Sequence, residues 1–124
     1  MGREVEHEGL REPPVTGVER NGDAVVVSLA GELDLYNAET VRTVLLEECA
    51  RNPGRIVIDL SRVEFIDSTA LGVLIEARTK LDNRRAFLLA APAVETRRAL
   101  EISGLDRHFR MHDTIDEALV ANVS

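Results

Sequence analysis

The sequence predicts an α/β fold in which a mixed β-sheet of about four to five strands carries helices packed largely on one side. Short apolar runs such as Ala24 to Ala30 and Arg55 to Leu60 alternate with longer stretches of helical periodicity such as Ser68 to Leu81. The order begins with two strands and continues as strand and helix in alternation. Such an order places one antiparallel pair beside parallel strands that are joined by helices.

The first two strands are expected to form a hairpin. Val15 to Glu19 is typical of a short edge strand, and Asn21-Gly22-Asp23 is a strong turn signal ahead of the valine-rich run Ala24 to Ala30. Gly31 is expected to break the second strand, because glycine weakens strand interiors. Glu32-Leu33-Asp34 would then form a polar connection.

A first helix is expected after this connection, with Asn37 as its N-cap and an end near Asn52-Pro53-Gly54. Cys49 falls within this helix and is expected to be a small packing residue. The side chains expected to face the core are Val41, Val44, Leu45 and Leu46.

The middle of the chain predicts a buried strand and a second helix. Arg55 to Leu60 is apolar and is bounded by the polar pair Ser61-Arg62, and Phe65-Ile66 follows shortly after. The helix predicted for Ser68 to Leu81 has one broad apolar face. Its N-cap is expected at its first residue or at Asp67.

The last third predicts one strand and two further helices. Ala86 to Ala90 is the strand, and Pro92 opens a third helix that runs through Ile102 and stops at Gly104. Thr114 and Glu117 have the spacing of a capping box ahead of a last short helix.

The length and composition are those of one folded domain. The chain has 124 residues, of which 44% are hydrophobic and 30% are charged. Residues 1–13 are charged and lack periodicity, and Pro13-Pro14 closes this segment. A flexible tail over 1–13 and a domain over 14–124 are expected.

Composition also disfavours several classes of function. The apolar runs are too short to span a membrane and the N-terminus is too polar for a signal peptide, so a cytoplasmic location is expected. A net charge of -7 disfavours binding to nucleic acid or to an anionic membrane. A single cysteine cannot form an internal disulfide or build a zinc site alone. We expect a monomer without metal or cofactor that binds a protein partner with a basic surface.

The most informative segment is Phe65-Ile66-Asp67-Ser68-Thr69-Ala70-Leu71-Gly72. An acid followed by two hydroxyls at a helix start is, in the simplest interpretation, an N-cap. The same position also suits phosphorylation, because a phosphate on Ser68 would lie at the positive end of the helix dipole. Phosphorylation could then change the surface without unfolding the domain.

These residues, together with Gly31-Glu32-Leu33-Asp34 upstream, resemble the signature of STAS-domain anti-sigma-factor antagonists. The resemblance covers Val15 to Val120 and includes Ser103-Gly104-Leu105, which is similar to a Ser-Gly-Leu turn of that family. It implies the STAS fold. One departure is Ala70, where many members have glycine.

The resemblance also implies a mechanism and a set of site residues. Ser68 would accept phosphate from a partner that is both anti-sigma factor and serine kinase, with Thr69 as the second candidate. The unphosphorylated protein would bind this partner and free the sigma factor. A PP2C-type phosphatase would remove the phosphate and so restore the unphosphorylated protein. ATP and magnesium would belong to the partner. The residues implied to meet the partner are Asp34, Asp67, Thr69, Leu71 and Gly72.

Alternative functions remain open within the same fold. STAS domains also serve as scaffolds of stress-signalling assemblies and as accessory subunits of membrane transporters. In each case the exposed side of the second helix, with Leu71, Ile75 and Arg78, could be a docking face, unless these residues pack against the sheet.

Catalytic and metal-binding alternatives are weaker. A hydrolase triad of Ser68, Asp67 and one of His7, His108 or His112 lacks the glycines of a nucleophile elbow. His108 and His112 have helical spacing but lack further zinc ligands nearby, so they are expected to be surface residues.

Overall fold

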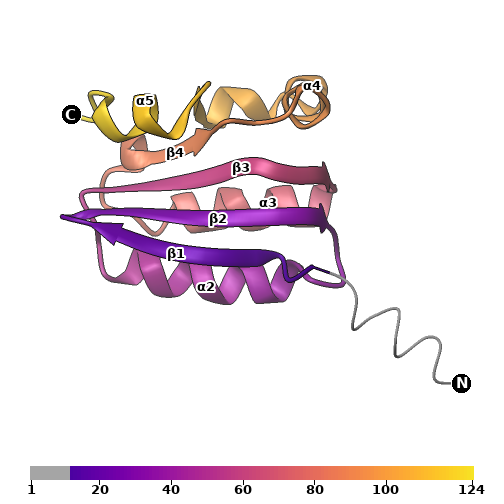
Figure 1. Cartoon of the computed structure of the whole chain (residues 1–124), viewed down its shortest axis with the longest axis horizontal. Coiled ribbons are helices and arrows are strands. Elements are labelled where there is room, and N and C mark those ends of the chain that lie inside the picture. The colour runs from indigo at the N-terminus through magenta and orange to yellow at the C-terminus, as the bar shows by residue number, and fades with distance from the viewer. Residues whose placement is uncertain (1–11) are drawn as a thin grey trace, which may run out of the picture.

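The computed structural model describes residues 12–124 and shows a five-stranded sheet in the order β1-β2-β3-β4-β5 (Figure 1). β1 runs antiparallel to β2, and each later strand runs parallel to its neighbour. The mixed α/β architecture predicted from the sequence is confirmed. The strands are β1 (Val15–Asn21), β2 (Ala24–Leu33), β3 (Arg55–Ile66), β4 (Phe87–Ala90) and β5 (Arg110–His112).

Within residues 12–124, four α-helices pack on this sheet. α2 and α3 lie together along one face, and α4 and α5 lie beside β4 (Figure 1). The large core fills the space between the sheet and α2 and α3, whereas a smaller cluster around Val57, Leu88 and Ala118 packs α5 on the other face. The helices are α2 (Ala38–Ala50), α3 (Ser68–Arg78), α4 (Val94–Ser103) and α5 (Ile115–Val120), with the 3-10 turns η1 (Arg84–Ala86) and η2 (Leu105–His108).

Cys49 on α2 packs in the large core, as its position in the helix predicts. Burial, with a smaller effect of the neighbouring Glu48 carboxylate, raises the pKa of the Cys49 thiol to about 11. A thiol with such a pKa stays protonated at neutral pH and is a poor nucleophile. Cys49 therefore acts as a small apolar side chain.

The prediction that Gly31 ends the second strand is wrong, because β2 continues through it to Leu33. Gly31 has a φ of 77°, a left-handed conformation that favours glycine. The register between β2 and β3 shifts at Gly31/Glu32, so the residue bends the strand instead of stopping it. This bend leads the strand directly to the loop before α2.

The segments Arg55 to Leu60 and Phe65-Ile66 form one long strand and not two separate ones. A register shift lies where Ser28 pairs with Asp59 and Ala30 pairs with Arg62. Asp59 satisfies local polar groups there, since its carboxylate accepts hydrogen bonds from the Ser61 backbone at 3.0 Å and the Ser28 hydroxyl at 3.2 Å. The polar Ser61-Arg62 pair is thus accommodated within the strand.

Most helix ends agree with the capping signals, but Pro92 does not open α4, which begins at Val94. Asp67 caps α3, which ends at Arg78 instead of Leu81. Gly104 ends α4 with a φ of 77°, and the Thr114 side chain accepts from the Glu117 backbone at the start of α5. None of the helices within residues 12–124 has the length and apolar character needed to cross a bilayer.

Candidate functional site

Asp67 organises the N-terminus of α3. It has the extended backbone of an N-cap residue, and its Oδ1 accepts a hydrogen bond from the Ala70 amide at 2.9 Å. Its own backbone amide donates to the Leu33 carbonyl at the end of β2 at 3.0 Å. The start of α3 is therefore attached to the neighbouring strand by main-chain and side-chain contacts.

The loop between β2 and α2 is a compact turn built around Asp34. Asp34 Oδ1 accepts from the backbone amides of Tyr36 and Asn37, at 3.0 and 3.3 Å. Asn37 in turn accepts from the Asp34 amide at 2.9 Å and donates to the Glu32 carbonyl at 2.8 Å. Asn37 occupies the N-cap position of α2 as predicted, but its side chain stabilises the preceding turn and does not cap the helix.

This turn is joined to the start of α3 by one hydrogen bond. The Leu35 amide donates to Asp67 Oδ2 at 3.1 Å. Asp34 and Asp67, which the sequence separates by more than thirty residues, thus belong to one connected surface. We call this surface, made of the turn, the end of β3 and the first turn of α3, the Ser68 surface.

Ser68 and Thr69 are exposed in the first turn of α3. Within residues 12–124, no group accepts from the backbone amides of Ser68 and Thr69, whereas the Ala70 amide is already bonded to Asp67. An exposed hydroxyl beside free amides at a helix N-terminus can carry a phosphate without loss of a packing contact.

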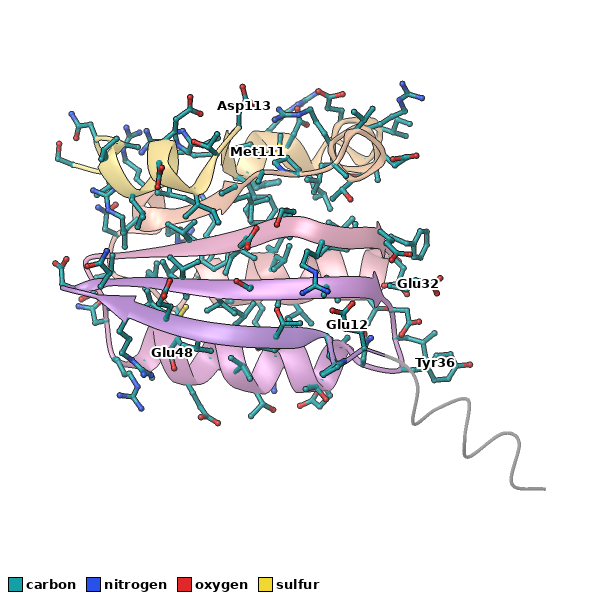
Figure 2. The ribbon with its side chains drawn as sticks, in the orientation of Figure 1. Glu12, Glu32, Tyr36, Glu48, Met111 and Asp113 are labelled. Carbon is teal, nitrogen blue, oxygen red and sulfur yellow. The ribbon has the colours of Figure 1, made fainter. Side chains whose placement is uncertain are left out.

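Three large apolar side chains of the Ser68 surface are exposed, and the sequence reasoning missed them. Leu35 is 61% exposed, Tyr36 is 81% exposed and Phe65 is 54% exposed. Figure 2 shows Tyr36 extending from the end of the molecule that also carries Glu32, which pairs in register with Phe65. Exposed aromatic side chains such as these are typical of protein-binding surfaces. The signal in the sequence was an apolar pair placed within a polar turn.

The structure corrects the expected role of Leu71. Its side chain is only 5% exposed and belongs to the large core, because α3 turns this side toward the sheet. Ile75 is also partly buried against the core. Gly72 is exposed, and a Cβ added there would have no heavy atom within 4 Å. Of the helix residues implied to meet a partner, Thr69 and Gly72 are thus accessible and Leu71 is not.

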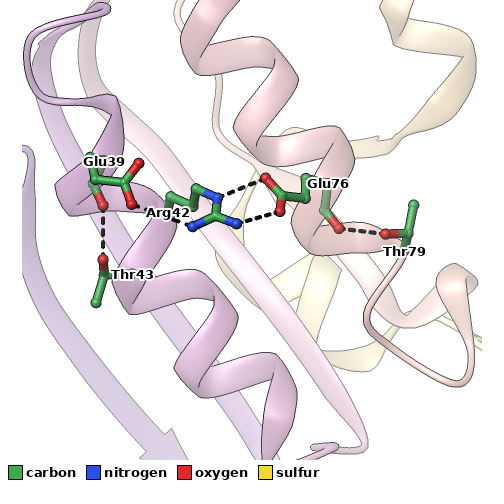
Figure 3. Close-up of polar contacts among 5 residues, drawn as sticks. All are labelled: Glu39, Arg42, Thr43, Glu76 and Thr79. Atoms are coloured by element: carbon green, nitrogen blue, oxygen red, sulfur yellow. Dashed lines mark hydrogen bonds and ion pairs between the residues drawn. The ribbon is translucent and has the colours of Figure 1, made fainter.

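A bidentate ion pair joins α2 to α3 (Figure 3). Arg42 on α2 donates to both carboxylate oxygens of Glu76, at 2.9 and 2.8 Å, and also to Glu39 at 3.3 Å. The hydrogen bond from Arg42 lowers the pKa of Glu76 below its ordinary value of 4.5. The two helices that position Ser68 and the Asp34 turn are therefore held together at their exposed side as well as through the core.

The histidines considered for a hydrolase triad lie away from Ser68. His112 pairs with Ala90, which lies on the strand next to β3 and pairs there with Asp59. Ile66, the last residue of β3 before Asp67 and Ser68, lies roughly 20 Å beyond Asp59 along the strand, at about 3.3 Å per residue. His108 precedes β5 at the opposite end of that strand, and His7 lies outside the described residues. Residues 12–124 hold no cluster of three potential metal ligands among their His, Cys, Asp and Glu side chains.

Comparison with known proteins agrees with this geometry. The family model of the STAS domain matches residues 16–118. The chain is 39% identical over 105 residues to the anti-sigma-F factor antagonist RsfB of Mycobacterium tuberculosis, and the match covers 85% of each chain.

Two solved structures add to this result. An anti-sigma factor antagonist from Mycobacterium paratuberculosis superposes with a TM-score of 0.79 at 36% identity, covering 89% of this chain and 96% of that one. The phosphorylated form of the Bacillus cell fate determinant SpoIIAA superposes with a TM-score of 0.63 at 25% identity, covering 83% and 95%. The chain therefore belongs to the STAS domain family, with anti-sigma factor antagonists among its relatives in sequence and structure.

Proposed function

We propose that this protein is an anti-sigma factor antagonist that is switched off by phosphorylation of Ser68. The unphosphorylated protein binds an anti-sigma factor with serine kinase activity, and this binding releases the sigma factor. Phosphorylation of Ser68 by the same partner ends the complex, and a PP2C-type phosphatase reverses the modification. Thr69 is the second candidate for the phosphate.

The single observation that carries this proposal is the exposed Ser68 hydroxyl in the first turn of α3, beside the capping carboxylate of Asp67. The position is rigid, because Asp67 links the helix to β2 and to the Asp34 turn. A kinase therefore meets a hydroxyl that is carried on a firmly held backbone. The relatives named as anti-sigma factor antagonists support the antagonist role, and the solved phosphorylated form of SpoIIAA supports a role for phosphorylation.

The Ser68 surface also explains how one phosphate can act as a switch. Binding through Leu35, Tyr36 and Phe65 would bury the region around Ser68 against the partner. A phosphoserine adds about -1.5 to -2 charges, which would lie near the carboxylates of Asp67 and Asp34 in that interface. Repulsion and desolvation worth about 3 kcal/mol would weaken binding by about two orders of magnitude.

The test is phosphorylation in vitro by candidate partners. The purified protein is incubated with ATP, Mg²⁺ and each candidate serine kinase anti-sigma factor from the same source, and its intact mass and modified site are determined. We expect one added phosphate on Ser68, absent from Ser68→Ala and retained in the matched variant Thr69→Ala. Calorimetry is expected to show tight binding of the partner before modification and weak binding afterwards.

The alternatives within the fold predict different results. Phosphate that appears on Thr69 in both wild type and Ser68→Ala would move the switch to the neighbouring hydroxyl. A protein that neither binds nor is modified by any candidate would contradict the antagonist role. A scaffold or a transporter subunit would then be favoured, and each would be recognised by stable co-purification with its own assembly.

A further inference from the structure

A small pocket lined by arginines lies at the end of α3 opposite to Ser68. It is formed where the C-terminus of α3, the turn η1 and the segment from η2 into β5 come together, and its volume is about 190 Å³. One of its arginines ends α3, two belong to η1, and two flank the start of β5. These residues are Arg78, Arg84, Arg85, Arg107 and Arg110.

This concentration of positive charge is unusual for the chain. Five of its 15 Lys and Arg residues line one small pocket, although the net charge of the protein is -7. His108 completes the polar lining, and no acidic side chain of the described part of the chain lines the pocket. Asp106 in η2 is close in sequence, but it is not part of the lining. Like charges held this close repel one another, so the arrangement favours an anion between them.

Three of the five guanidinium groups are available for a ligand. Within residues 12–124, the side chains of Arg78, Arg84 and Arg107 make no hydrogen bond or ion pair with the protein. The other two are held by the main chain. Arg85 donates to the Ser124 carbonyl at 3.1 Å, and Arg110 donates to the Asn122 carbonyl at 2.7 Å and the Arg85 carbonyl at 3.4 Å.

Two buried aromatic residues also belong to the pocket lining. They are Phe87 and Phe109, and their rings lie with centroids 6.0 Å apart. Both residues are buried in the core. A wall of low polarity beside the arginines strengthens their attraction for an anion relative to that of arginines surrounded by water.

We propose that this pocket binds a compact polyanion that carries more than one phosphate group. Guanidinium groups recognise phosphate oxygens with paired hydrogen bonds. The available arginines belong to three separate elements, so a singly charged anion would engage only one or two of them, whereas linked phosphates could reach all three. The volume of 190 Å³ is smaller than the roughly 300–1,000 Å³ typical of pockets for larger ligands.

The proposed site is independent of the Ser68 surface. Ser68 and Arg78 are the first and last residues of α3, and its 11 residues span about 16 Å. A bound polyanion therefore leaves the Ser68 hydroxyl accessible. The site would exist whether or not Ser68 is phosphorylated.

The test is calorimetric titration of the full chain with inorganic pyrophosphate at low ionic strength. The variant Arg84→Gln/Arg107→Gln removes two exposed arginines whose side chains make no hydrogen bond or ion pair in the described structure, so it is expected to keep the fold. Its matched control is Arg51→Gln/Arg98→Gln, which makes the same change in net charge at exposed positions outside the pocket lining. We expect wild type and control to bind alike, and the pocket variant to bind at least about tenfold more weakly.

Two further arms identify the ligand chemistry. Citrate tests whether any compact polyanion suffices, and sodium chloride at matched ionic strength tests for general screening. Pyrophosphate binding that exceeds citrate binding and depends on Arg84 and Arg107 supports the proposal. Absence of pyrophosphate binding, or equal loss in the pocket variant and the control, would overturn it. Neither result bears on whether Ser68 is phosphorylated.

Discussion

Leu35 and Asp67 are joined by a hydrogen bond in which the Leu35 amide donates to Asp67 Oδ2 at 3.1 Å. The other oxygen of the same carboxylate caps α3 through the Ala70 amide at 2.9 Å. One side chain thus fixes both the helix that carries Ser68 and the turn that carries the exposed Leu35 and Tyr36. The hydroxyl and the apolar part of the Ser68 surface are held in a single arrangement.

Substitution of Asp67 separates its two roles. Asp67→Ala is expected to lower the free energy of unfolding by about 1–2 kcal/mol, because it removes both the cap and the link to Leu35. Asp67→Asn keeps an oxygen for the Ala70 amide but has an amide group in place of the second oxygen, so it should lose less. Urea denaturation measures both variants. Equal losses in the two variants would show that the negative charge or the link to Leu35, and not the cap, stabilises this region.

Exposed apolar side chains of the Ser68 surface are expected to supply binding energy. Tyr36→Ala should weaken binding to the anti-sigma factor by about 10-fold to 100-fold, because well-exposed aromatic residues often become hot spots when an interface forms. Unfolding stability should remain unchanged, since Tyr36 is 81% exposed. Ile102→Ala is the matched control, an apolar residue 80% exposed on α4. Calorimetry that finds equal effects for both variants would place the interface elsewhere.

Gly72 offers a test that distinguishes folding from docking. Gly72→Ala should raise the free energy of unfolding by about 0.5–1 kcal/mol, because alanine is the better helix former and a Cβ meets no atom within 4 Å. A larger polar residue, Gly72→Gln, should also fold. If the partner packs on this turn of α3, Gly72→Gln will bind much more weakly than wild type. Unchanged affinity would exclude Gly72 from the interface.

The ion pair between Arg42 and Glu76 predicts a pH dependence of the free energy of unfolding. The hydrogen bond from Arg42 lowers the pKa of Glu76 below 4.5, so the ionised carboxylate is favoured in the folded state. Its stabilising effect is present in full above pH 4.5 and is lost as pH falls through the lowered value. Wild type should therefore be more stable than Glu76→Gln near neutral pH. The urea midpoints of the two proteins should converge in acid, and a difference independent of pH would contradict this account.

A second ion pair joins β1 to α2 and is more deeply buried on one side. Arg20 contacts Glu48 Oε2 at 2.6 Å, and the Glu48 side chain is only 8% exposed. Arg20→Ala should cost about 1–3 kcal/mol, because it leaves a buried carboxylate without its partner. Replacing the carboxylate as well, in Arg20→Ala/Glu48→Leu, should recover most of this loss. A double variant no more stable than Arg20→Ala would show that the unpaired carboxylate is not the cause of the loss.

Local sequence signals predicted the helices and the early strands well. The turn at Asn21-Gly22-Asp23, the end of α4 at Gly104 and the capping position of Asp67 each depend on the conformation of one or two residues. Such preferences act within a few residues, so they can be recognised without a fold. The resemblance that pointed to Ser68 likewise depended on a few short segments, the most informative of which lies at a helix start.

Strand continuity was harder to predict. β2 passes through Gly31 and β3 passes through Ser61-Arg62 because each is paired with the other along its length. β5 has only three residues and was not predicted, since its hydrogen bonds come from β4. A strand's existence depends on its neighbour, and the neighbour is distant in sequence.

The composition, the order of elements and the motif around Ser68 could therefore be recognised from the sequence alone, because each depends on neighbouring residues. Packing decided which side chains are accessible. It buried Leu71 in the core, exposed Tyr36 on the Ser68 surface, and brought five arginines from three segments around one pocket. Accessibility and convergence are properties of residues that meet only when the sheet and its helices assemble, so only the tertiary structure could decide them.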